Sequence, residues 1–181
     1  PKTTNASGLA TFSDLSINLA GSKNLTASSA GLTAAVSNAF TISAGTATQL
    51  VFIQQPTNTV AGTVISPSVT VQLKDTQGNN VSTAGVSITM SLSSGTGILS
   101  GTTPKTTNTS GLATFSDLSI NLAGSKNLMA SSTGLTSAVS SSFTISVGTA
   151  TKVVSVQQPV DKTVVVRADR GGRCSYRIVV V

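Results

Sequence analysis

The chain has 181 residues and a formal net charge of +6, but only 9% of its residues are charged and 3% are aromatic. It contains no His, Trp or Glu, and its carboxylates are Asp14, Asp75, Asp117, Asp161 and Asp169. General acid–base catalysis usually draws on His or paired carboxylates, and zinc sites need clustered Cys, His or carboxylates. We therefore expect no enzyme, no catalytic residue, no metal and no cofactor.

The positive charge is concentrated near the end of the chain. All four Arg residues lie in the last fifteen positions, whereas six Lys and three Asp are scattered singly before Val160. This distribution argues against a nucleic-acid partner. No apolar run approaches the roughly 18 residues of a membrane helix, so we expect no membrane insertion in this segment. A mean hydropathy of +0.27 argues against disorder.

An internal repeat organises the chain. Residues 1–56 and 104–159 match at an offset of 103, and 11 of these 56 positions differ. A period near 100 residues is too long for a solenoid unit and is typical of a tandem array of whole domains.

The repeat predicts three segments. Residues 47–149 form a complete repeat, and residues 1–46 are the C-terminal half of a truncated one. Residues 150–181 hold the first strand of a further repeat, followed after Pro159 by a divergent basic tail with the only Cys and the only Tyr. That tail is a native segment, an artificial junction or a frame error; the sequence leaves these open.

Within the complete repeat, apolar residues alternate with Ser, Thr and other polar residues. This period of two is typical of strands with one face on a core and one in water. The predicted strands are Leu50–Gln54, Val69–Leu73, Val86–Leu92, Leu112–Asp117, Asn127–Ser131 and Ser142–Ser146. Turn sequences separate them at residues 75–79, 94–97, 108–111 and 133–134.

About seven short strands in about 100 residues, with no helical period, predict an all-β fold. The expected architecture is an immunoglobulin-like β-sandwich, without the Cys and Trp residues of antibody domains. Its predicted core residues are Val69, Val71, Leu73, Val86, Ile88, Met90, Phe115, Leu128, Phe143 and Ile145.

The complete repeat resembles bacterial immunoglobulin-like repeats of the invasin and intimin (Big-1-like) type. The matching features are a core strand ending in Asp75, the Gly78-Asn79 turn and the Val86–Leu92 strand. A Gly-x-Ala-Thr-Phe hairpin at Gly111–Phe115 and a closing Phe143-Thr144-Ile145 strand complete them. The resemblance covers residues 1–159.

The resemblance implies a spacer or stalk module in a large bacterial surface or secreted protein, including adhesins. Its partners would be neighbouring Ig-like repeats, with a cell-surface or carbohydrate ligand bound through other domains. The alternative is a carbohydrate-contacting accessory module of a secreted enzyme or an adhesive tip. Exposed aromatic residues would favour that alternative, but the complete repeat has no Tyr or Trp.

Several residues invite a functional interpretation that the sequence does not support. Calcium takes six to eight oxygen ligands, usually from several carboxylates, and the two carboxylates Asp75 and Asp117 are too few to supply them. A Lys–Asn isopeptide bond at Asn38 is not a shared feature, because Ser141 replaces it in the second copy. Cys174 has no His in the chain that could activate it as a reactive thiol. Acceptor patterns for glycosylation at Asn5, Asn24, Asn80 and Asn108 are expected by chance in this composition.

Overall fold

The computed structural model describes residues 1–150, and the predictions for Cys174 and the basic tail lie outside that range. Residues Pro1–Gly148 form one compact unit. Every regular element in it is a β-strand. The described part contains no helix that could span a membrane.

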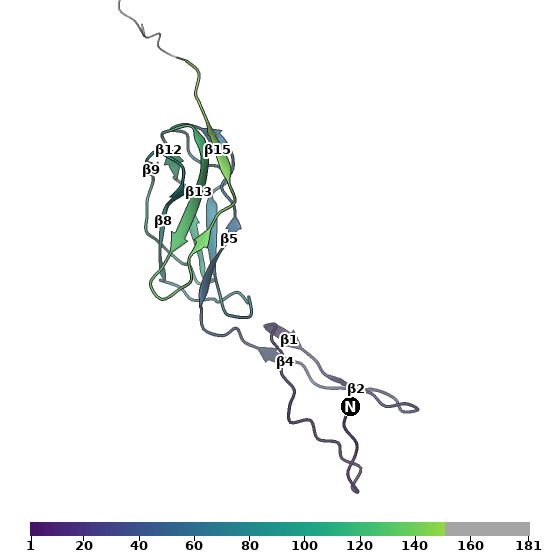
Figure 1. Cartoon of the computed structure of the whole chain (residues 1–181). Helices are drawn as coiled ribbons and strands as arrows, with labels where there is room; N and C mark the ends of the chain where they lie inside the picture. Colours follow the sequence, from purple (N-terminus) through teal and green to yellow (C-terminus); the bar gives the residue numbers. More distant parts are fainter. Residues whose placement is uncertain (151–181) are drawn as a thin grey trace, which may run out of the picture. The chain divides into compact units, whose positions relative to one another are not determined.

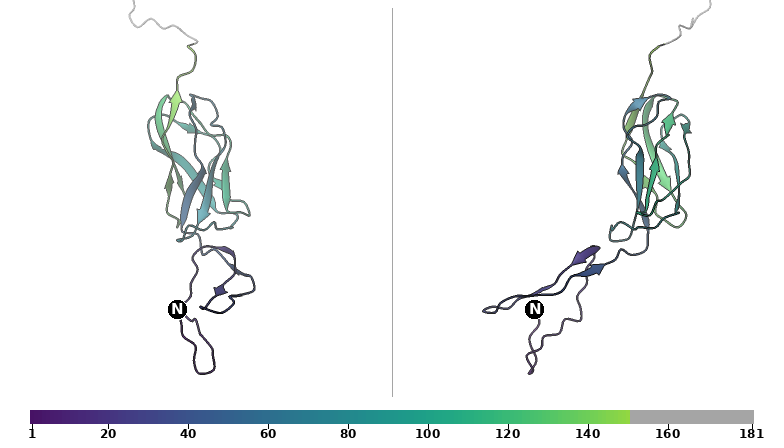
Figure 2. Two further views of the ribbon diagram at one scale, coloured as in Figure 1. Left: turned by 90° about the vertical axis from the view of Figure 1, so that its right-hand side faces the viewer. Right: turned by 180° about the vertical axis from the view of Figure 1, so that it is seen from behind.

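The first sheet of the complete repeat has three antiparallel strands in the order β11-β7-β5. These strands are β5 (Gln49–Gln54), β7 (Val69–Lys74) and β11 (Leu112–Phe115). Figures 1 and 2 show this layer packed against a second one.

The second sheet follows the order β10-β8-β13-β15-β6, with β14 also paired to β13. Its long strands are β8 (Ser87–Ser94) and β13 (Gly124–Ser131), and the closing strand is β15 (Phe143–Ser146). The short strand β6 (Thr59–Val60) runs parallel to β15. The other short strands of this sheet are β10 (Lys105–Thr106) and β14 (Ala138–Val139). A separate antiparallel pair is formed by β9 (Leu99–Ser100) and β12 (Ser119–Ile120).

The core consists of the inward residues of both sheets. Val69, Val71 and Leu73 of β7 are completely buried, as are Phe115 of β11 and Leu128 of β13. Nine of the ten predicted core residues belong to the buried cluster. The tenth, Val86, lies just before β8 and packs partly buried against the cluster. The predicted all-β, immunoglobulin-like fold is confirmed.

Two local predictions are wrong. The alternation of Val69, Val71 and Leu73 with polar residues predicts that Gln72 faces water, but Gln72 is only 5% exposed. The loops that follow β7 and β10 cover it, and its Nε2 donates to the carbonyl oxygens of Ser110 (3.0 Å) and Val81 (3.4 Å). Residues Gly111–Phe115 are not a hairpin: Gly111 ends a turn, and β11 pairs with the distant β7.

Strands of residues 1–46 pair only with one another among the described residues. β1 (Gly21–Lys23) pairs with β4 (Phe40–Ile42), and β2 (Thr26–Ala27) pairs with β3 (Ala35–Val36). Gly21 lies opposite Ile42, as Gly124 lies opposite Ile145 in the complete repeat. The register is therefore the same in both copies.

The two copies differ in burial. Phe12 is 48% exposed, whereas its counterpart Phe115 is 0% exposed. No residue before Leu50 is buried. Residues 9–12 form no strand, because the strand that would pair with them belongs to the half of the repeat that residues 1–46 do not contain. The division into domains at residues 46 and 149 stays a prediction.

Candidate functional site: the joint between repeats

The two carboxylates considered for calcium lie at opposite ends of one sheet. Asp75 directly follows β7, and Asp117 follows β11 by two residues. β7 and β11 are antiparallel, with Phe115 opposite Val69. Six residues of strand separate the two positions, or roughly 20 Å. Within residues 1–150, no three His, Cys, Asp or Glu side chains gather where they could hold a metal ion.

Asp75 is 2% exposed and is used as a hydrogen-bond acceptor. Its Oδ2 accepts from Asn79 Nδ2 and from the Gly45 N–H, both at 2.9 Å. Its Oδ1 accepts from the N–H groups of Asn79 (2.8 Å) and Gln77 (3.0 Å). The Asn79 side chain and these N–H groups outweigh burial and lower the pKa of Asp75 from 3.8 to about 2. The carboxylate organises a turn.

Asp117 also braces a loop. Its Oδ2 accepts from the hydroxyl and the N–H of Thr102, and both contacts lower the pKa of Asp117, the hydroxyl more strongly. Its buried Oδ1 has no hydrogen-bond partner among the described residues. One carboxylate with a single unpaired oxygen falls well short of a calcium coordination sphere.

The asparagines of the acceptor patterns have local structural roles. Asn5 Oδ1 accepts from the N–H groups of Ser7 and Leu9, and Asn108 accepts in the same way in the second copy. Asn80 Oδ1 accepts from Lys74 Nζ at 2.8 Å. Asn24 Nδ2 donates to the Ser37 carbonyl at 2.9 Å. At the position of Asn38, the Ser141 N–H donates to Gln55 Oε1.

The polar contact that stands out joins the truncated repeat to the complete one. Asn79 Nδ2 donates to the Asn18 carbonyl oxygen at 2.9 Å, and the Ala20 N–H donates to Asn79 Oδ1 at 2.9 Å. The Gly45 N–H reaches Asp75, as described above. Asn79 is 7% exposed, and its two hydrogen bonds to Asn18 and Ala20 are partly buried. We call these three contacts the joint.

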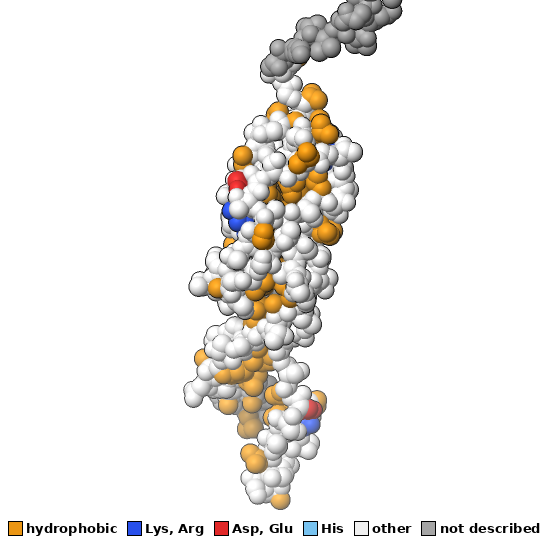
Figure 3. All heavy atoms as spheres, turned by 90° about the vertical axis from the view of Figure 1, so that its left-hand side faces the viewer, with side chains coloured by type: hydrophobic (Ala, Val, Ile, Leu, Met, Phe, Trp, Pro, Cys, Tyr) orange, Lys and Arg blue, Asp and Glu red, His pale blue; other side chains and the backbone are white. Residues whose placement is uncertain are grey.

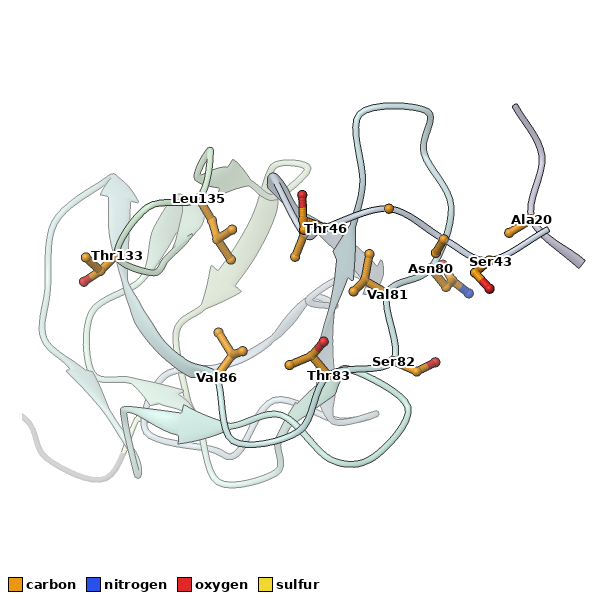
Figure 4. A pocket seen from close by; sticks show the side chains of 13 residues that line it. Ala20, Ser43, Thr46, Asn80, Val81, Ser82, Thr83, Val86, Thr133 and Leu135 are labelled. Carbon is orange, nitrogen blue, oxygen red and sulfur yellow. The ribbon is translucent and has the colours of Figure 1, made fainter. Parts of the chain in front are cut away.

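An open groove of about 940 Å³ runs beside the joint. Ala20 and Ser43 lie together at one end of it, and Thr133 and Leu135 lie at the other (Figure 4). Its lining contains Ala, Gly, Ser, Thr, Val, Leu and one Asn, with no ionisable and no aromatic side chain. Such a lining offers neither an acid–base pair nor a nucleophile with a base.

Comparison with known protein families matches residues 45–149 to the family described as SMCHD1 Ig-like domain 6. This match covers more than half of the chain. The chain belongs to this family of Ig-like domains. The match supports the immunoglobulin-like fold that the sequence predicts, and it does not distinguish the invasin and intimin type.

Two further comparisons concern whole proteins. A search of curated proteins finds no match to the Ig-like chain. Among solved structures, a β-glycosidase from Bacteroides vulgatus matches with a TM-score of 0.41 and 14% identity. The alignment covers 70% of this chain and 17% of that one, so the chain spans less than a fifth of that protein.

Charged side chains are sparse on the face of the described part that Figure 3 shows. That face is a mixture of white and orange, and blue or red side chains appear in only a few places. One lysine of the complete repeat, Lys126, is buried, with 1% exposure. Its stem lies on the inner face of β13, and its Nζ donates to the Ala123 carbonyl oxygen at 3.1 Å.

Sequence reasoning missed both Lys126 and the joint. Extending the alternation of Leu128 and Ala130 back by two residues places Lys126 on the inner face, so that signal was available. The joint has no corresponding sequence pattern, because the residues around Asn79 predict a turn and not its tertiary contacts.

Proposed function

We propose that this chain is a structural spacer module from a tandem array of Ig-like repeats. In this role each repeat is a rigid unit, and the array holds other domains of the same protein at a distance. Its direct partners are the neighbouring repeats. The observation that carries the proposal is the joint, which links two consecutive repeats through specific hydrogen bonds rather than through an unstructured linker.

We assign the array to the bacterial invasin and intimin type, at the cell surface or in a secreted protein such as an adhesin. The motifs at Asp75, Gly78-Asn79 and Phe143–Ile145 support this type. A surface rich in Ser and Thr suits an exposed stalk, because hydroxyl groups keep strands soluble without charge. Antibodies against the chain should label intact cells that express the parent protein, and labelling only after permeabilisation would contradict this location.

The proposal includes no catalytic role and no direct carbohydrate site. A carbohydrate-contacting module would be expected to offer aromatic side chains to its ligand. The Phe residues of the complete repeat are Phe52, Phe115 and Phe143, and their exposures are 7%, 0% and 3%. They belong to the core. The groove beside the joint has no aromatic residue either.

Changing the number of repeats tests the spacer function. Chains are made with one, two or three copies of residues 47–149, and their maximum dimension is measured by small-angle X-ray scattering. β8 and β13 have eight residues each, or about 26 Å at ~3.3 Å per residue. Each copy should therefore add a constant length of at least about 26 Å. Increments that shrink as copies are added would indicate a flexible chain and contradict the proposal.

Binding measurements on the same chains separate the spacer from the accessory module. A spacer gives no carbohydrate binding at any copy number. Binding to a panel of immobilised polysaccharides that grows with copy number would instead support the accessory module.

A further inference from the structure

The loop Asn121–Ala123 of the complete repeat has the same sequence as the loop that forms the joint. Residues 7–25 and 110–128 are identical, so Asn121 and Ala123 correspond to Asn18 and Ala20. Gly148 corresponds in the same way to Gly45. In the first copy these groups bind Asn79 and Asp75.

In the complete repeat, the described part of the chain supplies no partner for the corresponding groups. Among the described residues, no hydrogen bond is made by the carbonyl oxygen of Asn121 or by the N–H groups of Ala123 and Gly148. The side chain of Asn121 is already held, because its Oδ1 accepts from the Ile98 N–H at 2.7 Å. Within residues 1–150, the exposed Asn121 therefore has its backbone carbonyl oxygen, but not its side-chain oxygen, without a donor.

The loop keeps one of its shaping contacts whether or not a turn is bound to it. Lys126 Nζ donates to the Ala123 carbonyl oxygen at 3.1 Å, and Lys23 Nζ donates to the Ala20 carbonyl oxygen at 3.2 Å. This lysine contact is present both where the loop is occupied and where it is free. A preorganised site loses less conformational entropy when it binds.

We propose that the loop Asn121–Ala123, with Gly148, is a docking site for the Asp75–Asn79 turn of another copy of this repeat. The occupant follows from the first joint, where the same residues hold that turn. The inference rests on the proposed function, because it names the contact through which one spacer module recognises the next. Asn79 is its central residue, since its side chain both donates to and accepts from the loop.

This chain's own sequence does not supply the turn at the expected place. The repeat places the aspartate 103 residues after Asp75, at position 178, where the sequence has Ile178. The match between copies also stops after Pro159. The turn that fills the site therefore comes from a following repeat with the Asp-x-x-Gly-Asn sequence, that is, from a second copy of the module.

Amide hydrogen exchange tests the docking directly. The full chain is compared with an extended chain in which residues 1–149 are followed by a second copy of 47–149, with the native connection. We expect exchange of the Ala123 amide to slow by about tenfold in the extended chain. The Ala20 amide, which is already bonded, serves as the internal reference for a filled joint.

Two substitutions in the added copy identify the group responsible. Asn79→Ala there should return the exchange rate of Ala123 to that of the unextended chain. Asn80→Ala is the matched control, because Asn80 is the next residue and its side chain bonds to Lys74 rather than to the joint. It should leave Ala123 protected.

Equal exchange of Ala123 in the two chains, or protection that survives Asn79→Ala, would overturn the inference. The scattering experiment separates this from failure of the spacer function. Constant length increments with an unprotected Ala123 would refute the docking and leave the spacer intact. Shrinking length increments with a protected Ala123 amide would support the docking and contradict the rigid spacer.

Discussion

Phe12 and Phe115 offer a comparison in which the same substitution is made twice in the same local sequence. Both lie within the 19-residue stretch that is identical in the two copies. Phe115 is 0% exposed in β11, opposite Val69, whereas Phe12 is 48% exposed and belongs to no strand. Any difference between the two variants therefore reports tertiary burial and not local sequence.

We expect Phe115→Ala to lower the free energy of unfolding of the complete repeat by about 3–5 kcal/mol. Removing roughly 100–150 Å² of buried apolar area at ~25 cal/mol/Å² costs about 3 kcal/mol. The cavity that is left adds to this, which gives the range seen for buried Phe truncations. Phe12→Ala should change the same quantity by less than about 0.5 kcal/mol, as should Ser116→Ala at the exposed residue directly after β11.

Urea unfolding followed by far-UV circular dichroism measures these effects, because the chain has no Trp for fluorescence. For a domain of this size, the midpoint should fall by about 2 M or more in Phe115→Ala and stay unchanged in Phe12→Ala. Phe115→Leu, with an expected loss below about 1.5 kcal/mol, keeps the test usable if the alanine variant does not fold. Equal midpoints for Phe12→Ala and Phe115→Ala would refute the assignment of faces.

Three further predictions use other residues. Gly111 has φ of +74°, and a Cβ there would overlap the Val81 carbonyl oxygen, so Gly111→Ala should lower stability by about 3 kcal/mol or more in urea melts. Gly8 has φ of +75° but open space around it, so Gly8→Ala should cost only the backbone strain of about 1–2 kcal/mol. Because the pKa of Asp75 is lowered to about 2, the stability that its carboxylate contributes is complete above pH ~4 and is lost towards pH 2. The melting temperature should therefore fall more steeply between pH ~4 and pH ~2 in the native chain than in Asp75→Asn. The exposed apolar face of residues 1–46 should make the full chain associate with concentration in sedimentation, whereas 47–149 alone should remain monomeric.

The strands that the sequence predicts are those with a long alternating pattern. β7 and β8 each have three inward apolar residues, and β13 has two beside the buried Lys126. The positions of these strands differ from the predicted ranges by at most three residues. The two-residue strands β6, β9, β10, β12 and β14 were not predicted. A strand of two residues has no period, and its pairing depends on where the long strands place it.

The candidate site was largely beyond sequence analysis for a similar reason. Asp75 and Asn79 were assigned to a turn, and the structure shows that turn with four N–H donors around the carboxylate. What the sequence could not show is that Asn79 also reaches Asn18 and Ala20, about 60 residues earlier. Contacts between turns depend on tertiary placement, and a local residue pattern does not encode them.

The two copies separate the part of an Ig-like repeat that is encoded locally from the part that is not. The hairpin contacts of β1 with β4 keep the register of β13 with β15 even where no core covers them. The lysine contact to the Ala20 or Ala123 carbonyl is likewise kept in both copies. Strand pairing with β7 and burial of Phe115 occur only where the first half of a repeat is present. The docking loop thus belongs to the locally encoded part, so it can present the same surface at every joint regardless of how completely the rest of its repeat is assembled.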